Sequence, residues 1–316
     1  MKSEINVLIT AEENGMRIDS AVSKLNPKIS RTKAGELIKK GEIQLDNLPT
    51  KVSAKVKEGQ TITMPSEVEN EVDEKLVAED IPIDILYEDN DIVVVNKPKD
   101  MVVHPAAGNW SGTLVNAMLG KTELSDENGE FRPGIVHRLD KNTTGVMVVA
   151  KNNEAHRNLA EQIQNHKIKK IYLALVRGVV KENEGVIELP IGRHPTDRKK
   201  QAVVKGGREA YTKFKVLERF DGYTLVEVEL KTGRTHQIRV HMSHIGYPVV
   251  GDDTYSSGKN PFGVTSQMLH SHILGFTHPT KNEWMEFEAP LPKKFEAVLK
   301  KLRLGDVPQK SQKRNL

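Results

Sequence analysis

One stretch of the sequence, residues 134–151, restricts the possible folds more than any other. It has two short apolar segments, residues 135–136 and residues 146–149, on either side of a polar loop. Short apolar segments that are rich in valine and isoleucine are typical of buried β-strands. We therefore expect two neighbouring buried strands with an ionic loop at their ends. The ionisable residues of this loop are His137, Arg138, Asp140 and Lys141.

The carboxylate of Asp140 is a candidate nucleophile. Aspartate has an ordinary pKa of about 3.9, so it is ionised at neutral pH, and neighbouring cations favour the ionised form. An ionised carboxylate can attack an electrophile but cannot act as a general acid. The alternative is a structural role, in which Asp140 accepts hydrogen bonds from backbone amides near Asn142 and Thr143, as aspartates in turns do.

From about residue 84 onwards the sequence is rich in strand patterns. Residues 210–220 and 223–230 flank Asp221-Gly222, where glycine tolerates the positive φ of a tight hairpin turn. This pattern predicts an α+β domain built on a mixed, mostly antiparallel sheet with flanking helices. The other expected strands are residues 92–95 and 168–176, and the expected helices are residues 113–119, 154–166, 235–245 and 293–302.

The sequence pattern of the N-terminal part predicts a separate small module. Apolar residues at positions 18, 21, 22 and 25 indicate an amphipathic helix over residues 17–25. Ser30 is a typical N-cap and Gly41 a typical C-terminal stop for a second helix. Strands at residues 43–45 and 61–64, with a turn at Asp46-Asn47, complete a small hairpin. The second helix should expose the basic residues Arg31, Lys33, Lys39 and Lys40.

Changes in composition divide the chain into four parts. Residues 67–83 are mostly acidic and lack periodicity, which indicates a linker. We therefore expect a module at residues 1–66, an acidic linker at 67–83, the α+β domain at 84–303 and a basic disordered tail at 304–316.

Charge and cysteine content restrict the function classes. The net charge is only +4, but the basic residues are segregated from the acidic linker, which favours a polyanionic partner. The alternative is that these lysines are ordinary solvated surface. No apolar run approaches the roughly 18 residues of a membrane span, and no signal peptide is apparent. The absence of cysteine favours a cytoplasmic protein. The basic clusters are residues 39–40, 167–170, 193–200 and 310–314.

Three ordered motifs give the chain a family resemblance. His137-Arg-Leu-Asp140-Lys-Asn-Thr-Thr-Gly145 resembles the signature of the RluA/RluD family of RNA pseudouridine synthases. Residues 170–178 and 230–241 resemble the second and third motifs of that family. One departure is Asn142, where the family more often has an acidic residue. The N-terminal module resembles the αL RNA-binding motif of a ribosomal protein, through Arg17-Ile-Asp19, Ser30-Arg31 and residues 40–43.

The resemblance implies roles for individual residues. It implies that Asp140 is the nucleophile, that Arg239 forms an ion pair with it, and that Tyr172 lies against the target uracil. Arg138 would fill the space that a flipped-out uridine vacates. We expect Arg138 and Asp140 to share one face of a strand, because they are two residues apart. The other residues expected to bind RNA are His137, Arg234 and His236 near the nucleophile, and Arg17, Arg31, Lys33, Lys39 and Lys40 in the N-terminal module.

No cofactor or metal is expected for this chemistry, because pseudouridine formation is an isomerisation with no redox change. His236, His241 and His244 could suggest zinc, but their spacings of five and three do not converge on one helix face. His104 could line the same pocket, and we assign it no role.

The leading hypothesis is a monomeric, cytoplasmic isomerase that acts on uridines of large-subunit ribosomal RNA, either free or within a pre-ribosomal particle, without binding a membrane. One alternative keeps the chemistry and changes the substrate to transfer RNA. Another is a non-catalytic RNA-binding or ribosome assembly factor. The combination of Asp140, Tyr172 and Arg239 argues against the last alternative, because a non-catalytic pocket has no chemical need for all three.

Overall fold

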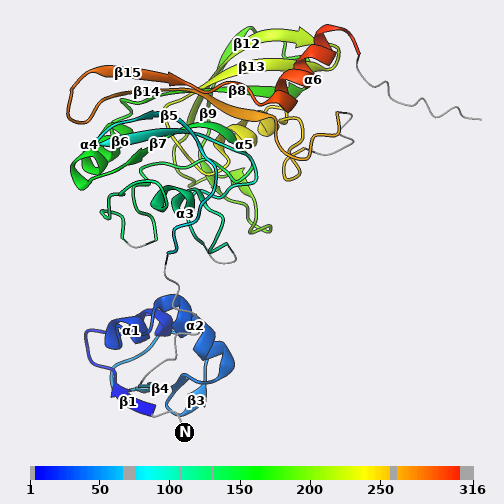
Figure 1. Cartoon of the computed structure of the whole chain (residues 1–316). Helices are drawn as coiled ribbons and strands as arrows, with labels where there is room; N and C mark the ends of the chain where they lie inside the picture. The colour runs from blue at the N-terminus through cyan, green and yellow to red at the C-terminus, as the bar shows by residue number, and fades with distance from the viewer. Residues whose placement is uncertain (1–3, 67–75, 107–108, 130, 257–261, 307–316) are drawn as a thin grey trace, which may run out of the picture. The chain divides into compact units, whose positions relative to one another are not determined.

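The computed structural model describes residues 4–66, 76–106, 109–129, 131–256 and 262–306. The chain divides into two compact units, Met1–Glu74 and Lys75–Leu316, and each is considered by itself (Figure 1). Within the described residues, no helix is both long enough and apolar enough to cross a bilayer.

The smaller unit packs two helices on a four-stranded antiparallel sheet, in the order β1-β4-β2-β3. The Ser30 hydroxyl caps the second helix by accepting from the amide of Lys33, and Gly41 ends it with φ 77°. Both predictions are confirmed. Ile18, Val22 and Leu37 belong to its separate core. The elements are β1 Glu4–Leu8, α1 Ile18–Leu25, α2 Arg31–Lys40, β2 Gln44–Leu45, β3 Leu48–Pro49 and β4 Thr61–Pro65.

The strand arrangement of this unit differs from the predicted hairpin. Strand β1 was not predicted, because its side chains are mostly exposed and show no buried face. The turn at Asp46-Asn47 has positive φ at both residues, 52° and 60°, and it joins β2 to the short strand β3. Strand β3 therefore lies between β2 and β4 in the sequence, and it pairs with β2 at the edge of the sheet.

The larger unit is built on one nine-stranded sheet, in the order β5-β6-β7-β14-β8-β13-β12-β9, with β15 paired to β14. Only the β7–β14 pairing is parallel, so the predicted mixed, mostly antiparallel sheet is confirmed. Strands β10 and β11 form a separate pair. The strands are β5 Asp84–Glu88, β6 Ile92–Lys97, β7 Thr144–Ala150, β8 Lys169–Arg177, β9 Glu184–Glu188, β10 Ile191–Arg193, β11 Gln201–Val203, β12 Tyr211–Phe220, β13 Tyr223–Leu230, β14 Leu269–Thr277 and β15 Trp284–Glu288.

Apolar cores cover both faces of this sheet. Along β6, Val93 and Val95 pack on one face with helices α3 and α5, whereas Ile92 and Val94 pack on the other face with α4. Helix α6 covers β8 and β13 on that second face (Figure 1). This double burial explains why β6 is an unbroken apolar run. The helices are α3 Leu114–Leu119, α4 Asn153–Gln164, α5 Gln237–His244 and α6 Lys293–Arg303.

Two parts of the larger unit differ from expectation. Residues 135–136 do not form a strand; Ile135 makes only an isolated bridge with Val149, on the edge of β7 opposite to β6. Part of the expected linker, residues 67–75, lies outside the described residues. Leu76, Ile81 and Ile83, however, pack against the core. The expected tail lies outside the described residues from residue 307 onwards.

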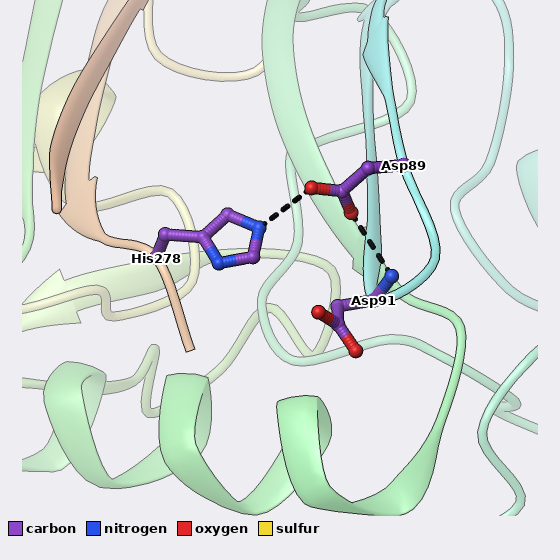
Figure 2. A group of neighbouring side chains, drawn as sticks. All are labelled: Asp89, Asp91 and His278. Carbon is purple, nitrogen blue, oxygen red and sulfur yellow. Dashed lines mark hydrogen bonds and ion pairs between the residues drawn. The ribbon is translucent and has the colours of Figure 1, made fainter. Parts of the chain in front are cut away.

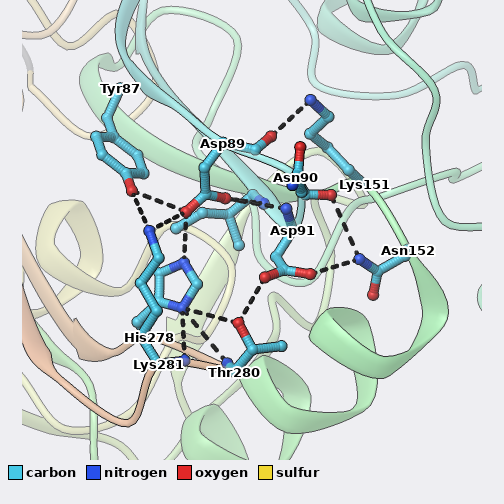
Figure 3. A network of polar contacts seen from close by, with 10 residues as sticks. Tyr87, Asp89, Asn90, Asp91, Lys151, Asn152, His278, Thr280 and Lys281 are labelled. Carbon is cyan, nitrogen blue, oxygen red and sulfur yellow. Dashed lines mark hydrogen bonds and ion pairs between the residues drawn. The ribbon is translucent and has the colours of Figure 1, made fainter.

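A polar network joins the β5–β6 turn to the β14–β15 turn (Figure 3). Asp89 Oδ2 accepts from His278 Nε2 at 2.8 Å, from Lys281 Nζ at 2.8 Å and from the Tyr87 hydroxyl at 2.7 Å. Its Oδ1 accepts from the amides of Asp91 and Ile92. Burial opposes ionisation of Asp89, but these hydrogen bonds outweigh it and hold its pKa well below the usual range.

The carboxylates of Asp89 and Asp91 lie close to the His278 ring, as metal ligands would (Figure 2). Protein donors already engage these atoms. His278 Nδ1 accepts from the amide of Lys281 at 3.1 Å, which leaves Nε2 to donate to Asp89. Asp91 accepts from Thr280 and Asn152. The group therefore acts as a polar junction between two turns and the start of α4.

Replacement of Asp89 by asparagine should lower the free energy of unfolding of the larger unit by about 2–4 kcal/mol at pH 7, because the buried His278 and two amides lose a charged acceptor. The folded pKa of Asp89 is depressed, so its contribution is present above about pH 4 and is lost as pH falls through the folded pKa. The difference between wild type and variant should therefore shrink in acid. Both tryptophans, Trp110 and Trp284, lie in the larger unit, so urea unfolding followed by tryptophan fluorescence measures it. A constant difference from pH 7 to pH 3 would contradict the assignment.

Candidate active site

Three side chains form an ionic array that joins two distant parts of the chain. Arg239, on α5, donates from Nη1 to Asp140 Oδ2 at 3.0 Å. The same guanidinium donates from Nε and Nη2 to both oxygens of Asp252, at 2.7 and 3.0 Å. Arg239 and Asp252 are buried, whereas the Asp140 side chain is 18% exposed. The array therefore presents one carboxylate towards solvent and holds the other two groups inside.

The array fixes the direction of the Asp140 carboxylate. Burial works against the charge of Arg239, but the hydrogen bonds and charge of Asp252, followed by those of Asp140, raise its pKa above the usual value. The guanidinium is therefore a permanent cation that donates a hydrogen bond to Asp140 from a fixed position. The prediction that Arg239 partners Asp140 agrees with this geometry. Asp252 was not predicted, because no motif or periodicity marks an aspartate that approaches from a loop.

The position of Arg239 depends on how α5 is anchored. Gln237 Oε1 accepts from the Thr232 hydroxyl at 2.8 Å and from the amide of Arg234 at 2.9 Å. Its Nε2 donates to the carbonyl of Tyr211 on β12 at 2.9 Å. Because of these bonds the helix begins at Gln237, two residues later than expected, and is tied directly to the sheet.

The turn that carries Asp140 is held by its backbone. The Asp140 carbonyl accepts from the amide of Thr143 at 3.0 Å, and within the described residues no backbone amide donates to its carboxylate. The structural alternative for this side chain therefore has no support. Two residues later, Asn142 Oδ1 is buried with no hydrogen-bond partner.

Gly145 lets this turn approach the sheet closely. It has φ 115°, and a Cβ at this position would lie 2.1 Å from the carbonyl oxygen of Ser271 on β14. The backbone at Gly145 pairs in parallel with Ser271. Only glycine allows both the conformation and the contact, so Gly145 sets how closely the Asp140 turn sits on β14.

A small pocket, here called the inner pocket, surrounds Asp140. Its volume is about 80 Å³. Tyr172, on β8, lies on its wall and is 8% exposed. Burial raises the pKa of the Tyr172 phenol to about 12, and the charge of Asp140 acts in the same direction. The ring is therefore neutral at physiological pH and offers a flat apolar surface beside a carboxylate. The residues that line the inner pocket include Arg138, Asp140, Tyr172, Arg234, His236 and Arg239.

Arg138 and His137 differ in their surroundings. Arg138 is exposed and lines the inner pocket. Residues 137–140 are not a strand, so the expectation that alternation places Arg138 beside Asp140 is wrong; the irregular turn brings them to one pocket instead. His137 Nε2 accepts from the amide of Val148 at 3.1 Å. Desolvation lowers the pKa of His137 to about 4, so His137 is a neutral ring that anchors the turn to β7.

His236 borders the carboxylate from the other side. Its Nε2 lies 3.9 Å from Asp140 Oδ2, and its Nδ1 lies 2.8 Å from the Tyr255 hydroxyl. Burial lowers the pKa of His236, although Asp140 opposes this. His241 is engaged elsewhere, since its two ring nitrogens lie 2.9 Å from the hydroxyl of Thr212 and the carbonyl of Leu189.

A buried lysine, which no motif or periodicity of the sequence marks, also supports the turn that carries Asp140. Lys97, at the end of β6, is fully buried. Its ammonium donates to the carbonyls of Pro98, Met101 and Lys141 at 2.7, 2.9 and 3.0 Å. Desolvation lowers its pKa to about 7, while Asp140 raises it. Lys97 therefore ties β6 to the residue that follows Asp140.

The basic residues predicted in the smaller unit fall into two groups. Arg17 and Arg31 both donate to the buried carboxylate of Asp19, at 2.9–3.1 Å, and keep exposed side chains. Lys39 and Lys40 are exposed in the last turn of α2, and Lys33 is half-buried in its first turn. The arginines are thus held in fixed positions, whereas Lys39 and Lys40 extend into solvent.

Comparison with known proteins agrees with both units. Residues 91–244 match the family model for RNA pseudouridylate synthase, and residues 16–62 match the model for the S4 domain. The uncharacterised RNA pseudouridine synthase YlyB of Bacillus subtilis is 42% identical, over 95% of this chain and 99% of its own length. The ribosomal large subunit pseudouridine synthase D of Pseudomonas aeruginosa is 43% identical, over 92% and 93%. Among solved structures, human RNA pseudouridylate synthase domain containing 1 aligns with a TM-score of 0.54 and 27% identity, over 73% of this chain and 99% of that chain.

Proposed function

The chain belongs to the RNA pseudouridine synthase family and carries an N-terminal S4 domain, and we propose that it converts specific uridines of large-subunit ribosomal RNA into pseudouridine, with Asp140 as the nucleophile. The observation that carries the residue assignment is the Asp140–Arg239–Asp252 array at the wall of a pocket that contains Tyr172. The name of the relative from Pseudomonas aeruginosa supports the choice of ribosomal RNA.

The reaction is an isomerisation. The bond between uracil N1 and ribose C1′ breaks, the base turns, C5 bonds to C1′, and the C5 proton is replaced by a proton on N1. Atoms and electrons balance without any further reactant. The protein must supply a nucleophile, hold the free base and exclude water. Asp140 supplies the first, whether it attacks the ribose, adds to the base or promotes elimination, since all three routes use an ionised carboxylate next to the nucleotide.

The neighbours of Asp140 have separate roles in this proposal. Arg239 aims the carboxylate through the hydrogen bond from Nη1. The ring of Tyr172 stacks against the uracil. The pKa of its phenol, about 12, keeps the side chain uncharged. His236 lies within reach of the same carboxylate oxygen and is available for contact with the substrate. His137 and Lys97 position the turn that carries Asp140.

Arg138 is proposed to fill the gap that the flipped uridine leaves in folded RNA. Unstacking a base costs about a few kcal/mol, and a planar cation with five donors can replace some of the lost contacts. We expect Arg138→Ala to lower kcat/KM at least about tenfold more on a structured ribosomal RNA hairpin than on an unpaired oligonucleotide with the same target. The comparison requires rates of pseudouridine formation on both substrates with both proteins. Equal losses on the two substrates would exclude the flipping role.

Purified protein and defined transcripts test the choice of substrate. We expect pseudouridine to form in a large-subunit ribosomal RNA transcript and not in a pool of unmodified transfer RNA. Product in transfer RNA alone would favour the alternative substrate, and RNA binding without product in either would favour a non-catalytic assembly factor. The proposal includes a cytoplasmic location and a monomer that acts on free RNA or a pre-ribosomal particle.

A further inference from the structure

A basic groove adjoins the inner pocket and shares Arg138, Tyr172 and Arg234 with it. Its volume is about 700 Å³. Among the described residues that line it there is no aspartate or glutamate. A groove lined by one sign of charge concentrates the opposite charge, and here it suits an RNA backbone. The cations of the basic groove are Arg132, Arg138, Lys170, Arg208, Lys231 and Arg234.

Lys170 stands out within the basic groove because it is buried without a counterion. It is 8% exposed, and among the described residues its ammonium reaches only the carbonyl of Lys231, at the long distance of 3.5 Å. Within the described part of the chain, no carboxylate lies within 4 Å of Lys170 Nζ. An ammonium has three donors, so at least two of them have no protein acceptor here.

The electrostatic surroundings of Lys170 are unfavourable as they stand. Desolvation, followed by the positive charge of Arg234, lowers the pKa of Lys170 to about 8. Burying an unpaired cation beside a second cation costs free energy unless an anion binds close to both. Ionisable side chains with strongly shifted pKa values are concentrated at functional sites.

Arg234 provides the second half of the same site. Its Nε donates to the carbonyl of Glu209 at 2.8 Å, and its amide is fixed by Gln237. Its two terminal nitrogens have no acceptor among the described residues. The guanidinium is therefore held by its stem and can still offer donors to a ligand in the basic groove.

The position of Lys170 on β8 relates this site to the reaction. Lys170 and Tyr172 are two residues apart on one strand, so their side chains leave the same face about 7 Å apart. A uracil stacked on Tyr172 therefore brings an adjoining part of the RNA backbone towards Lys170.

We propose that Lys170 and Arg234 bind the RNA phosphodiester adjacent to the flipped uridine. This site rests on the proposed function and extends it by fixing the strand that carries the target. The phosphate would accept from the free donors of both side chains and would supply the missing counterion.

A double-mutant cycle between protein and RNA tests the site. The probe is a large-subunit ribosomal RNA hairpin that the wild-type protein binds, prepared with one neutral methylphosphonate linkage at a time around the candidate target uridine. We expect wild type to lose about tenfold in affinity at one adjacent linkage, and Lys170→Met to lose about tenfold on the unmodified hairpin but nothing more at that linkage. The slope of log Kd against log salt should fall by about one in the variant. Lys170→Gln should behave as Lys170→Met does.

Lys169→Gln is the matched control. Lys169 is the preceding residue on β8, points to the opposite face and pairs with Glu286 at 2.7 Å, so its loss should leave affinity and salt slope unchanged. Wild-type affinity in both Lys170 variants, or an equal loss at every linkage with the slope intact, would overturn the site. Thermal unfolding verifies that each variant is folded. If wild type shows the linkage effect but forms no pseudouridine, the proposed function fails while the phosphate site stands.

Discussion

Replacement of Asp140 by asparagine is expected to abolish pseudouridine formation while leaving RNA affinity within about twofold of wild type. Asparagine keeps the shape of the side chain and can still accept from Arg239 Nη1, but it has no charge with which to attack. Loss of a nucleophile commonly lowers kcat by at least about four orders of magnitude. Single-turnover assays on a ribosomal RNA transcript measure the rate, and direct binding measures the affinity.

Asp221→Asn is the matched control for this substitution. Asp221 is exposed in the turn between β12 and β13, and Asn-Gly suits such a turn as well as Asp-Gly does. Its activity should equal that of wild type. A rate for Asp140→Asn within about tenfold of wild type would remove the nucleophilic role, and a large loss of RNA affinity would point to a binding role instead.

Replacement of Arg239 by methionine is expected to damage stability and activity together. The Asp252 carboxylate is fully buried, and without Arg239 the donors left to it in the described parts of the chain are the amides of Thr254 and Tyr255. An uncompensated buried charge of this kind costs about 3–5 kcal/mol. Asp140 loses the hydrogen bond that aims it, so turnover should also fall by at least about a hundredfold. Urea unfolding followed by tryptophan fluorescence and single-turnover assays measure the two effects.

The double variant Arg239→Met/Asp252→Asn separates the two effects. Neutralising Asp252 removes the stranded charge, so the double variant should regain much of the lost stability but none of the lost activity. Arg303→Met, which breaks the exposed pair with Glu218, is the matched control and should cost less than about 1 kcal/mol. A stability of Arg239→Met close to that of wild type would show that the array does not hold this part of the fold.

The sequence predicted those helix ends and turns that depend on interactions between residues close together in the chain. Ser30 and Gly41 bound α2 because a hydroxyl cap and a left-handed glycine act within one helical turn. Gly222 has φ 72° in the predicted hairpin turn. Strand β1 was not predicted, because it joins the sheet by pairing with the distant β4. Its own side chains show no alternation of buried and exposed positions.

In the candidate site, too, some residues could be predicted from the sequence and others could not. The motifs that contain Asp140, Tyr172 and Arg239 are continuous in sequence, so a family resemblance found them. Asp252 and Lys97 belong to none of those motifs, and they act only through contacts that the fold creates. The charge of Lys97 even suggests an exposed residue, although its three carbonyl acceptors keep it fully buried. The residues that hold a nucleophile in place are therefore harder to predict than the nucleophile itself.

The most direct test of the central claim is a map of pseudouridine across all RNA of cells that lack this gene and are complemented with wild type or with Asp140→Asn. The account predicts that a defined set of uridines in large-subunit ribosomal RNA is modified with wild type and unmodified with Asp140→Asn at equal protein levels. Restoration of those pseudouridines by Asp140→Asn would contradict it.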